Sequence, residues 1–150
     1  MKLVRRMAVA EGLVWFSMMC AGNAFGLDAC SLLTSAQVAT ALDVPEVKAE
    51  PGPKGCTWTS AKDAPGPAKT AWLKLEDEQG VEGAKVSLGR QETPVKGVGD
   101  AAMQNTTQGQ RTVLSVKKGD VYFAIRVAGL RLDQAKAAEQ VLARYIIAKL

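Results

Sequence analysis

The 150-residue sequence predicts an α+β domain from three observations. Residues 112–116 and 121–127 alternate apolar and polar side chains around a Lys-Gly-Asp segment, which is typical of a β-hairpin. Thr34 followed three residues later by Gln37 is typical of a capped helix start. From Asp133 onward, apolar side chains recur at the spacing of an amphipathic helix. Strands between a short helix and a longer one indicate a mixed fold.

The first 26 residues predict a secretory signal peptide. A basic start is followed by a mostly apolar run over residues 7–19 and then by small residues up to Gly26. The run is too short for a membrane-spanning helix, which needs about 20 apolar residues. Cleavage after Gly26 leaves one domain over residues 27–150, a usual domain size. We therefore expect an exported protein, periplasmic or extracellular, with no transmembrane segment after processing.

Three alternatives to this processing stay open. Ala24 offers a competing cleavage site. Cys20 is a candidate for lipidation, although the lipoprotein peptidase requires a small residue directly before the cysteine and Met19 stands there. Glu11 lies within the apolar run and keeps open the third alternative, an ordinary buried N-terminal helix.

Composition excludes several classes of function. Residues 27–150 carry 16 of the 19 basic side chains and 14 of the 15 acidic ones, so the net charge falls from +4 to +2. Nucleic-acid binding needs a concentrated basic face, and the only adjacent basic pair in this domain is Lys117-Lys118. The absence of histidine excludes His-based triads and His-ligated zinc. We expect no nucleic-acid partner and no cofactor.

Two cysteines, Cys30 and Cys56, follow the leader and enclose 25 residues. Their spacing is not Cys-x-x-Cys, and no basic residue stands directly beside either one to lower a thiol pKa. This favours a structural disulfide, which would stabilise the fold by about 3–4 kcal/mol in the chain-entropy model. A redox or nucleophilic pair is the alternative.

Turn residues divide the mature chain into short elements. The expected elements are a helix over residues 34–42, strands over 44–49, 56–60 and 70–76, a weakly helical stretch over 79–88, the hairpin strands, and a helix from 133 to the C-terminus. Trp58 shares a strand face with Cys56 and is expected in the core. In the last helix, Val141 and Tyr145 are expected on the apolar stripe and Glu139 on the polar side.

The hairpin register follows from matching its two apolar faces. With Lys118-Gly119 at the tip, three pairs face each other: Val116 with Val121, Leu114 with Phe123, and Thr112 with Ile125. A wider loop with a bulge is the alternative, because the tight turn would force a positive φ on Lys118.

Strand alternation also predicts a candidate binding face. Trp72 lies on the charged side of its strand, and Arg111, Tyr122 and Arg126 lie on the side of the hairpin opposite its apolar face. These four residues form the candidate surface for a protein or a small ligand.

No residue pattern rises to a catalytic or metal site. Three consecutive acids at residues 76–78 lack the ligand spacing of a calcium site. The glycine-bearing segment 96–102 lacks the Gly-Lys-Ser/Thr ending of a phosphate loop and is expected to be a turn. Asp100, Glu76 and Asp120 are the acids nearest the ordered elements, and the sequence brings no two of them together.

The motif order resembles that of a known family. Asp28-Ala29-Cys30-Ser31-Leu32-Leu33-Thr34 leads into a helix, Gly55-Cys56-Thr57-Trp58 follows, and Gly97-Val98-Gly99-Asp100-Ala101-Ala102, the hairpin and an alanine-rich helix complete the series. This is similar to small exported bacterial domains of unknown function, many of them lipoproteins, that open with Cys-Ser-Leu-Leu-Thr.

The resemblance implies a Cys30–Cys56 bridge and a fold similar to the PsbP-like sandwich. That fold is a curved antiparallel sheet, here of about 5–6 strands, with an N-terminal and a C-terminal helix packed on it. The resemblance brings no catalytic residues. The chain departs from the family at Cys20, where a well-formed lipidation site is missing.

Export, a disulfide and the lack of a reactive cluster together favour a non-enzymatic binding or interaction module of the envelope. A secreted inhibitor or effector is an alternative, with the loop at residues 63–69 as the segment that would enter a target. A carboxylate-based hydrolase is a weaker one.

Overall fold

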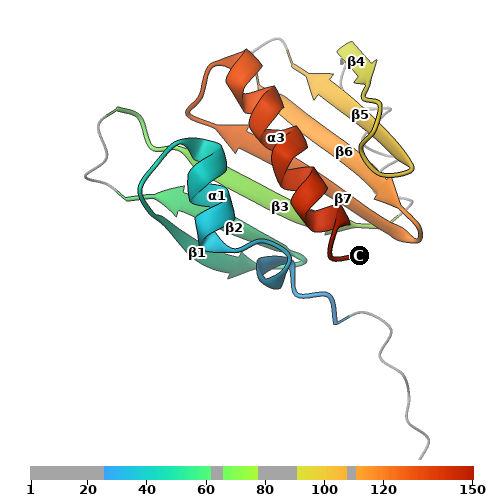
Figure 1. Cartoon of the computed structure of the whole chain (residues 1–150), viewed down its shortest axis with the longest axis horizontal. Helices are drawn as coiled ribbons and strands as arrows, with labels where there is room; N and C mark the ends of the chain where they lie inside the picture. Colours follow the sequence, from blue (N-terminus) through green and yellow to red (C-terminus); the bar gives the residue numbers. More distant parts are fainter. Residues whose placement is uncertain (1–25, 62–65, 78–90, 108–110) are drawn as a thin grey trace, which may run out of the picture.

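The computed structural model describes residues 26–61, 66–77, 91–107 and 111–150. Within them the chain forms one seven-stranded antiparallel sheet with the strand order β1-β2-β3-β7-β6-β5-β4 (Figure 1). The strands are β1 (Val47–Gly52), β2 (Gly55–Ser60), β3 (Thr70–Glu76), β4 (Gln91–Pro94), β5 (Ala101–Thr106), β6 (Thr112–Lys118) and β7 (Val121–Ala128). The helices are the 3₁₀ turn η1 (Ala29–Ser31), α1 (Ser35–Leu42) and α3 (Leu132–Ile147). The α+β class is confirmed.

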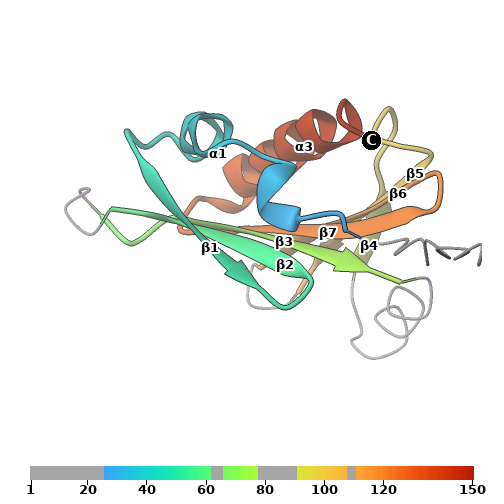
Figure 2. The ribbon, with the colours of Figure 1, turned by 90° about the horizontal axis from the view of Figure 1, so that it is seen from below.

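Both α-helices pack on the same face of the sheet (Figure 2). The short helix α1 contacts β1, β2 and β3, whereas α3 contacts β6 and β7. The core lies between these layers and contains the helix-side residues of the central strands, such as Trp58, Leu73 and Ile125. No helix of the described residues covers the opposite face, which we call the open face.

Helix α1 begins as the sequence predicts. The hydroxyl of Thr34 accepts a hydrogen bond from the Gln37 amide at 3.2 Å, and the Gln37 side chain accepts one from the Thr34 amide at 2.9 Å. At the other end, the Lys69 ammonium donates to the carbonyls of Leu42 and Asp43 at 3.0 and 3.1 Å. Both ends of the helix are thereby supplied with partners that its own backbone lacks.

The predicted disulfide is present. Cys30 in η1 bonds to Cys56 in β2 with an S–S length of 1.97 Å and a Cα–Cα distance of 5.1 Å. Trp58, two residues along β2, is 1% exposed, which confirms its place in the core. The bridge therefore joins the N-terminal turn covalently to the second strand from the β1 edge of the sheet.

The hairpin forms, but its predicted register is wrong by two residues. Val116 pairs with Phe123 and Leu114 with Ile125, so the two-residue turn is Gly119-Asp120. Gly119 takes the positive φ of 56° that Lys118 would have had to adopt. A shift of two residues keeps each side chain on its predicted face, because strand side chains alternate with period two.

The predicted strand number of 5–6 is too low, because β4 and β5 were not expected. Strand β4 has only four residues, and the turn expected over residues 96–102 includes the first two residues of β5. That segment does turn the chain: Gly97 and Gly99 have φ values of 74° and 62°. Strand β1 also begins at Val47 rather than at residue 44.

Helix α3 begins at Leu132, so that Asp133 lies in its first turn and not at its N-cap. The predicted stripe is also partly wrong. Val141 and Tyr145 are 40% and 38% exposed, whereas Glu139 is fully buried. Compared with the prediction, the helix is rotated about its axis so that Glu139 faces the sheet. Hydrophobic periodicity instead places this acid on the solvent side.

Several predictions fall on residues outside those that the structure describes. These are residues 1–25 of the signal peptide, with the competing cleavage site at Ala24 and the lipidation candidate Cys20, the helical stretch at 79–88 and part of the loop at 63–69. Among the described helices, none has the length and apolar character needed to cross a bilayer.

Candidate functional site

The candidate binding face is centred on β3 and β7, which lie side by side in the middle of the sheet. Their register places Trp72 opposite Arg126, Lys74 opposite Ala124 and Glu76 opposite Tyr122. These residues alternate with core residues and therefore share the open face. We call Trp72, Arg126, Lys74, Glu76 and Tyr122 the β3–β7 row. At about 3.3 Å per residue, the row extends over about 13 Å.

Arg111 lies apart from this row. It is exposed and directly precedes β6, outside the paired residues of the strand. The structure thus brings together three of the four residues chosen from sequence, Trp72, Tyr122 and Arg126, and leaves Arg111 at the end of a neighbouring strand.

Side-chain contacts organise the row. The Lys74 ammonium lies 3.5 Å from the Glu76 carboxylate. Lys117 of β6 holds its ammonium 5.1 Å from the centre of the Tyr122 ring, within the range of a cation–π interaction. Trp72 is half-buried among them. The row therefore combines aromatic surface with charges that are already partly paired.

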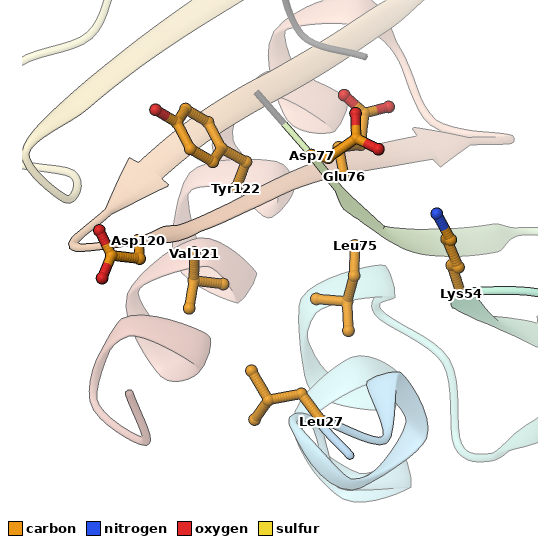
Figure 3. Close-up of a pocket in the computed structure, with 8 residues that line it drawn as sticks. All are labelled: Leu27, Lys54, Leu75, Glu76, Asp77, Asp120, Val121 and Tyr122. Atoms are coloured by element: carbon orange, nitrogen blue, oxygen red, sulfur yellow. The ribbon is translucent and has the colours of Figure 1, made fainter. Parts of the chain in front are cut away.

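A pocket of about 500 Å³ lies at the end of this row (Figure 3). Its lining residues come from four segments that are distant in sequence: Leu27, Lys54, Leu75, Glu76, Asp77, Asp120, Val121 and Tyr122. Leu27, Leu75 and Val121 lie along one side, and the polar groups lie toward the other (Figure 3). Sequence reasoning missed the pocket, because only the fold brings these segments together.

Two hairpin turns, β1–β2 and β6–β7, and the end of strand β3 build most of the pocket. Strand β3 ends at Glu76, and β7 begins at Val121 directly after the Gly119-Asp120 turn. Lys54 lies in the β1–β2 turn, and its carbonyl accepts a hydrogen bond from the Leu75 amide at 2.7 Å. The backbone hydrogen bond between Leu75 and Lys54 thus supports one side of the pocket, and the Gly119-Asp120 turn supports another.

The charges of the lining are mostly negative. Glu76, Asp77 and Asp120 contribute three carboxylates, and Lys54 contributes one ammonium. The described residues contain no group of three or more acids, cysteines or histidines placed to hold a metal ion. We call the acids Glu76, Asp77 and Asp120 the rim of the pocket, and Leu27, Leu75 and Val121 its apolar wall.

Asp100 has a structural role at a neighbouring turn. Its carboxylate accepts a hydrogen bond from the Gly119 amide at 2.7 Å and lies 3.3 Å from the Lys118 ammonium. The hydrogen bond from the Gly119 amide has the larger effect in lowering the pKa of Asp100 below its ordinary value, and the hydrogen bond from Lys118 lowers it further. Asp100 thereby ties the segment before β5 to the tip of the β6–β7 hairpin, which carries Asp120.

A second hollow, of about 440 Å³, lies between α1 and α3. Its lining includes Ala41, Leu130, Val141 and Tyr145, together with the Lys69 side chain that caps α1. Val141 and Tyr145 are the exposed side chains that had been expected in the core. The rotation of α3 therefore leaves part of its apolar surface in this groove.

Glu139 is the one buried acid among the described residues, and its carboxylate has three donors. Oε1 accepts from the Val127 amide at 2.9 Å, and Oε2 accepts from Gln104 Nε2 at 2.6 Å and from the Thr112 hydroxyl at 3.2 Å. Burial raises the pKa of Glu139 to about 7, and these hydrogen bonds and the Arg126 charge oppose the shift only in part. We call Glu139, Gln104, Thr112 and Val127 the Glu139 cluster.

Comparison with family models, curated proteins and solved structures yields no match to this chain. The arguments about function therefore depend on the chemistry of the sites themselves.

Proposed function

We propose that this protein is an exported, non-enzymatic binding module. Its ligand site would be the pocket at the end of strands β3 and β7, with the β3–β7 row as an extension. Tyr122 and Glu76 carry this proposal, because each belongs both to the row and to the pocket lining. A ligand in the pocket would therefore reach the face that carries Trp72 and Arg126.

The lining favours a ligand with an apolar body and a cationic group. Leu27, Leu75 and Val121 offer a wall that an alkyl or aromatic group can cover. Glu76 is paired with Lys74, but the lining still carries two further acids, Asp77 and Asp120, against the single ammonium of Lys54, so a cationic group is favoured over an anionic one. Such a ligand could be a small amphipathic amine or an apolar peptide segment with a lysine.

The alternatives have less support. A carboxylate-based hydrolase needs two acids held together in a cleft, with one in an apolar environment. The pocket does bring Glu76, Asp77 and Asp120 together, but none of the three is buried. The one buried acid of the described residues, Glu139, faces amide and hydroxyl donors rather than a pocket. The inhibitor or effector hypothesis depends on the loop at 63–69, which lies partly outside the described residues.

Titration calorimetry with n-octylamine as the probe tests the proposal, and n-octanoate serves as the probe of opposite charge. Octylamine should bind at a single site, and Asp120→Asn should weaken it at least fivefold because the rim loses a carboxylate. Asp133→Asn is the matched control, since Asp133 is an exposed acid on α3.

Equal binding of octanoate and octylamine would contradict the choice of a cationic ligand. An equal loss of affinity in the Asp120→Asn and Asp133→Asn variants would place the site elsewhere. Tyr122→Ala tests the extension of the site along the row, and it should weaken octylamine binding more than Arg111→Ala does.

A further inference from the structure

The β6–β7 hairpin is interrupted at the end far from its turn. Pairing between the two strands stops at Leu114 and Ile125. The next inward-facing pair in this register would be Thr112 with Val127, and those two residues are instead joined through Glu139 of α3. Beyond the break, Thr112 pairs with β5 and Val127 with β3. The side-chain carboxyl group of Glu139 thus takes the place of direct pairing between Thr112 of β6 and Val127 of β7.

Gln104 is suited to bind this carboxyl group in either protonation state. Its Nε2 donates to Glu139 Oε2 at 2.6 Å and to the Thr112 hydroxyl at 2.5 Å, whereas its Oε1 is buried without a partner in the described structure. A half turn of the amide exchanges the two atoms. In one orientation the amide nitrogen donates to an ionised Glu139. In the other orientation the amide oxygen accepts from a protonated Glu139.

Two distances around the Gln104 amide are short, as the protonated form would require. Hydrogen bonds from nitrogen to oxygen usually span 2.7–3.2 Å, whereas those from a hydroxyl to oxygen span 2.5–3.0 Å. The 2.6 Å between Gln104 and Glu139 and the 2.5 Å between Gln104 and Thr112 fall below the first range and within the second. A carboxylic acid and a hydroxyl that both donate to the Gln104 oxygen would match these distances.

Little charge is available to compensate an ionised Glu139. No lysine or arginine among the described residues forms an ion pair with it, and Arg126 of β7 acts only through a weaker Coulomb attraction. Helix α1 contains no charged residue, and the β5 and β6 residues that face α3 are uncharged. On α3 itself, Lys136 is the nearest cation in sequence and is only half-buried.

We propose that the Glu139 cluster is a proton-binding site that couples the docking of α3 to proton uptake. While Glu139 holds its proton, α3 closes the interrupted end of the hairpin. When the proton is lost, an uncompensated charge is buried there and α3 loosens from β6 and β7. This device is independent of the proposed ligand pocket, because the two share no residue.

The direction of the pH effect follows from linkage. Below about pH 4.5, the ordinary pKa of the group, Glu139 is protonated in both the folded and the unfolded chain. Between 4.5 and about 7 only the folded chain keeps the proton, so stability falls as the pH rises. Above 7 both states are ionised and the loss is complete. At tenfold per pKa unit, the unfolding constant rises about 300-fold.

The direct test is a carbon-13 NMR titration of the Glu139 side-chain carboxyl in the full mature chain. A midpoint at pH 6 or above supports the proposal, and a midpoint below pH 6 overturns it. Amide hydrogen exchange of α3, corrected for the intrinsic pH dependence, should in parallel accelerate between pH 5 and 8.5.

Variants distinguish the effect of the Glu139 proton on stability from the effect of the size of the side chain. Glu139→Gln keeps the size and removes the titration, so most of the 300-fold change in the unfolding constant between pH 4 and 9 should disappear. Glu46→Gln, at an exposed position, should retain the full change. If Glu139→Gln does not fold, Thr112→Val is used, which removes one donor to the carboxylate and should raise the midpoint. An unaltered or lower midpoint in that variant would contradict the proposal.

Discussion

The two halves of the sheet are held together by different chemistry. In the half formed by β1, β2 and β3, a covalent bridge joins η1 to β2, and α1 packs nearby with both ends capped. In the half formed by β7, β6 and β5, α3 packs through its apolar face and also through a buried acid that replaces a strand contact. We therefore expect the first half to be sensitive to reduction and the second half to pH. Each half can therefore be perturbed by a condition that the other tolerates.

The largest expected effect is on the bridged half. Replacing both Cys30 and Cys56 by alanine should lower the free energy of unfolding by about 3–4 kcal/mol, because the unfolded chain regains the freedom of a 26-residue separation. Urea unfolding at pH 5 measures this. Tris(2-carboxyethyl)phosphine, which reduces disulfides at this pH, should reproduce the loss in the unaltered protein and should leave the double variant unchanged. A loss below about 1 kcal/mol would mean that packing alone holds η1 in place.

The next effect concerns the acid-dependent half. Raising the pH from 4 to 9 should lower the free energy of unfolding by about 3 kcal/mol through Glu139, since the folded pKa of about 7 exceeds the ordinary 4.5. The same decrease should appear in the Cys30→Ala/Cys56→Ala variant, because the two sites share no partner and their effects should add. A pH effect that vanishes with the disulfide would show that the buried environment of Glu139 depends on the bridge, so that the two halves are not independent.

A close backbone approach in the acid-dependent half gives the third prediction. A Cβ on Gly99 would lie 2.5 Å from the Lys117 carbonyl oxygen and 2.8 Å from a Val116 methyl group, at a φ of 62°. Gly99→Ala should therefore cost about 2–3 kcal/mol of stability. Gly97→Ala is the control: its φ is also positive, but no atom lies within 4 Å, so it should cost only about 1 kcal/mol. Equal losses would mean that the loop moves aside.

The smallest effect is local to α1. Thr34→Ala removes the hydroxyl that accepts from the Gln37 amide and should cost about 1 kcal/mol. Thr40→Ala, within the same helix, removes a hydroxyl that only donates back to the Ala36 carbonyl and should be neutral or slightly stabilising. Thermal unfolding of the two variants side by side measures the contribution of the cap.

The sequence predicts the bridged half better than the acid-dependent half, and the reason is physical. The capping box, the cysteine pair and the core position of Trp58 depend on residues that are close in sequence or on a strong chemical preference. The position of Glu139 depends on Gln104, Thr112 and Val127, which lie on three different strands. Without those partners, a glutamate in an amphipathic helix is expected to face water.

The candidate site shows the same division. Alternation within strands placed Trp72, Tyr122 and Arg126 on one face, because side-chain direction is a local property of a strand. The pocket could not be predicted in the same way. It combines Leu27, a turn residue at Lys54 and the tips of two other strands, and these meet only when the sheet has its final strand order.

One measurement tests the contrast between the halves most directly: amide hydrogen exchange followed at pH 5 and 8.5, each with and without tris(2-carboxyethyl)phosphine, which reduces disulfides at both pH values. Reduction alone should speed exchange in η1, α1 and β1 and leave α3 protected. The higher pH alone should, after correction for intrinsic rates, speed exchange in α3 and at Val127 and leave α1 protected. If either condition opens both helices to the same extent, the two halves are not held separately and the account is wrong.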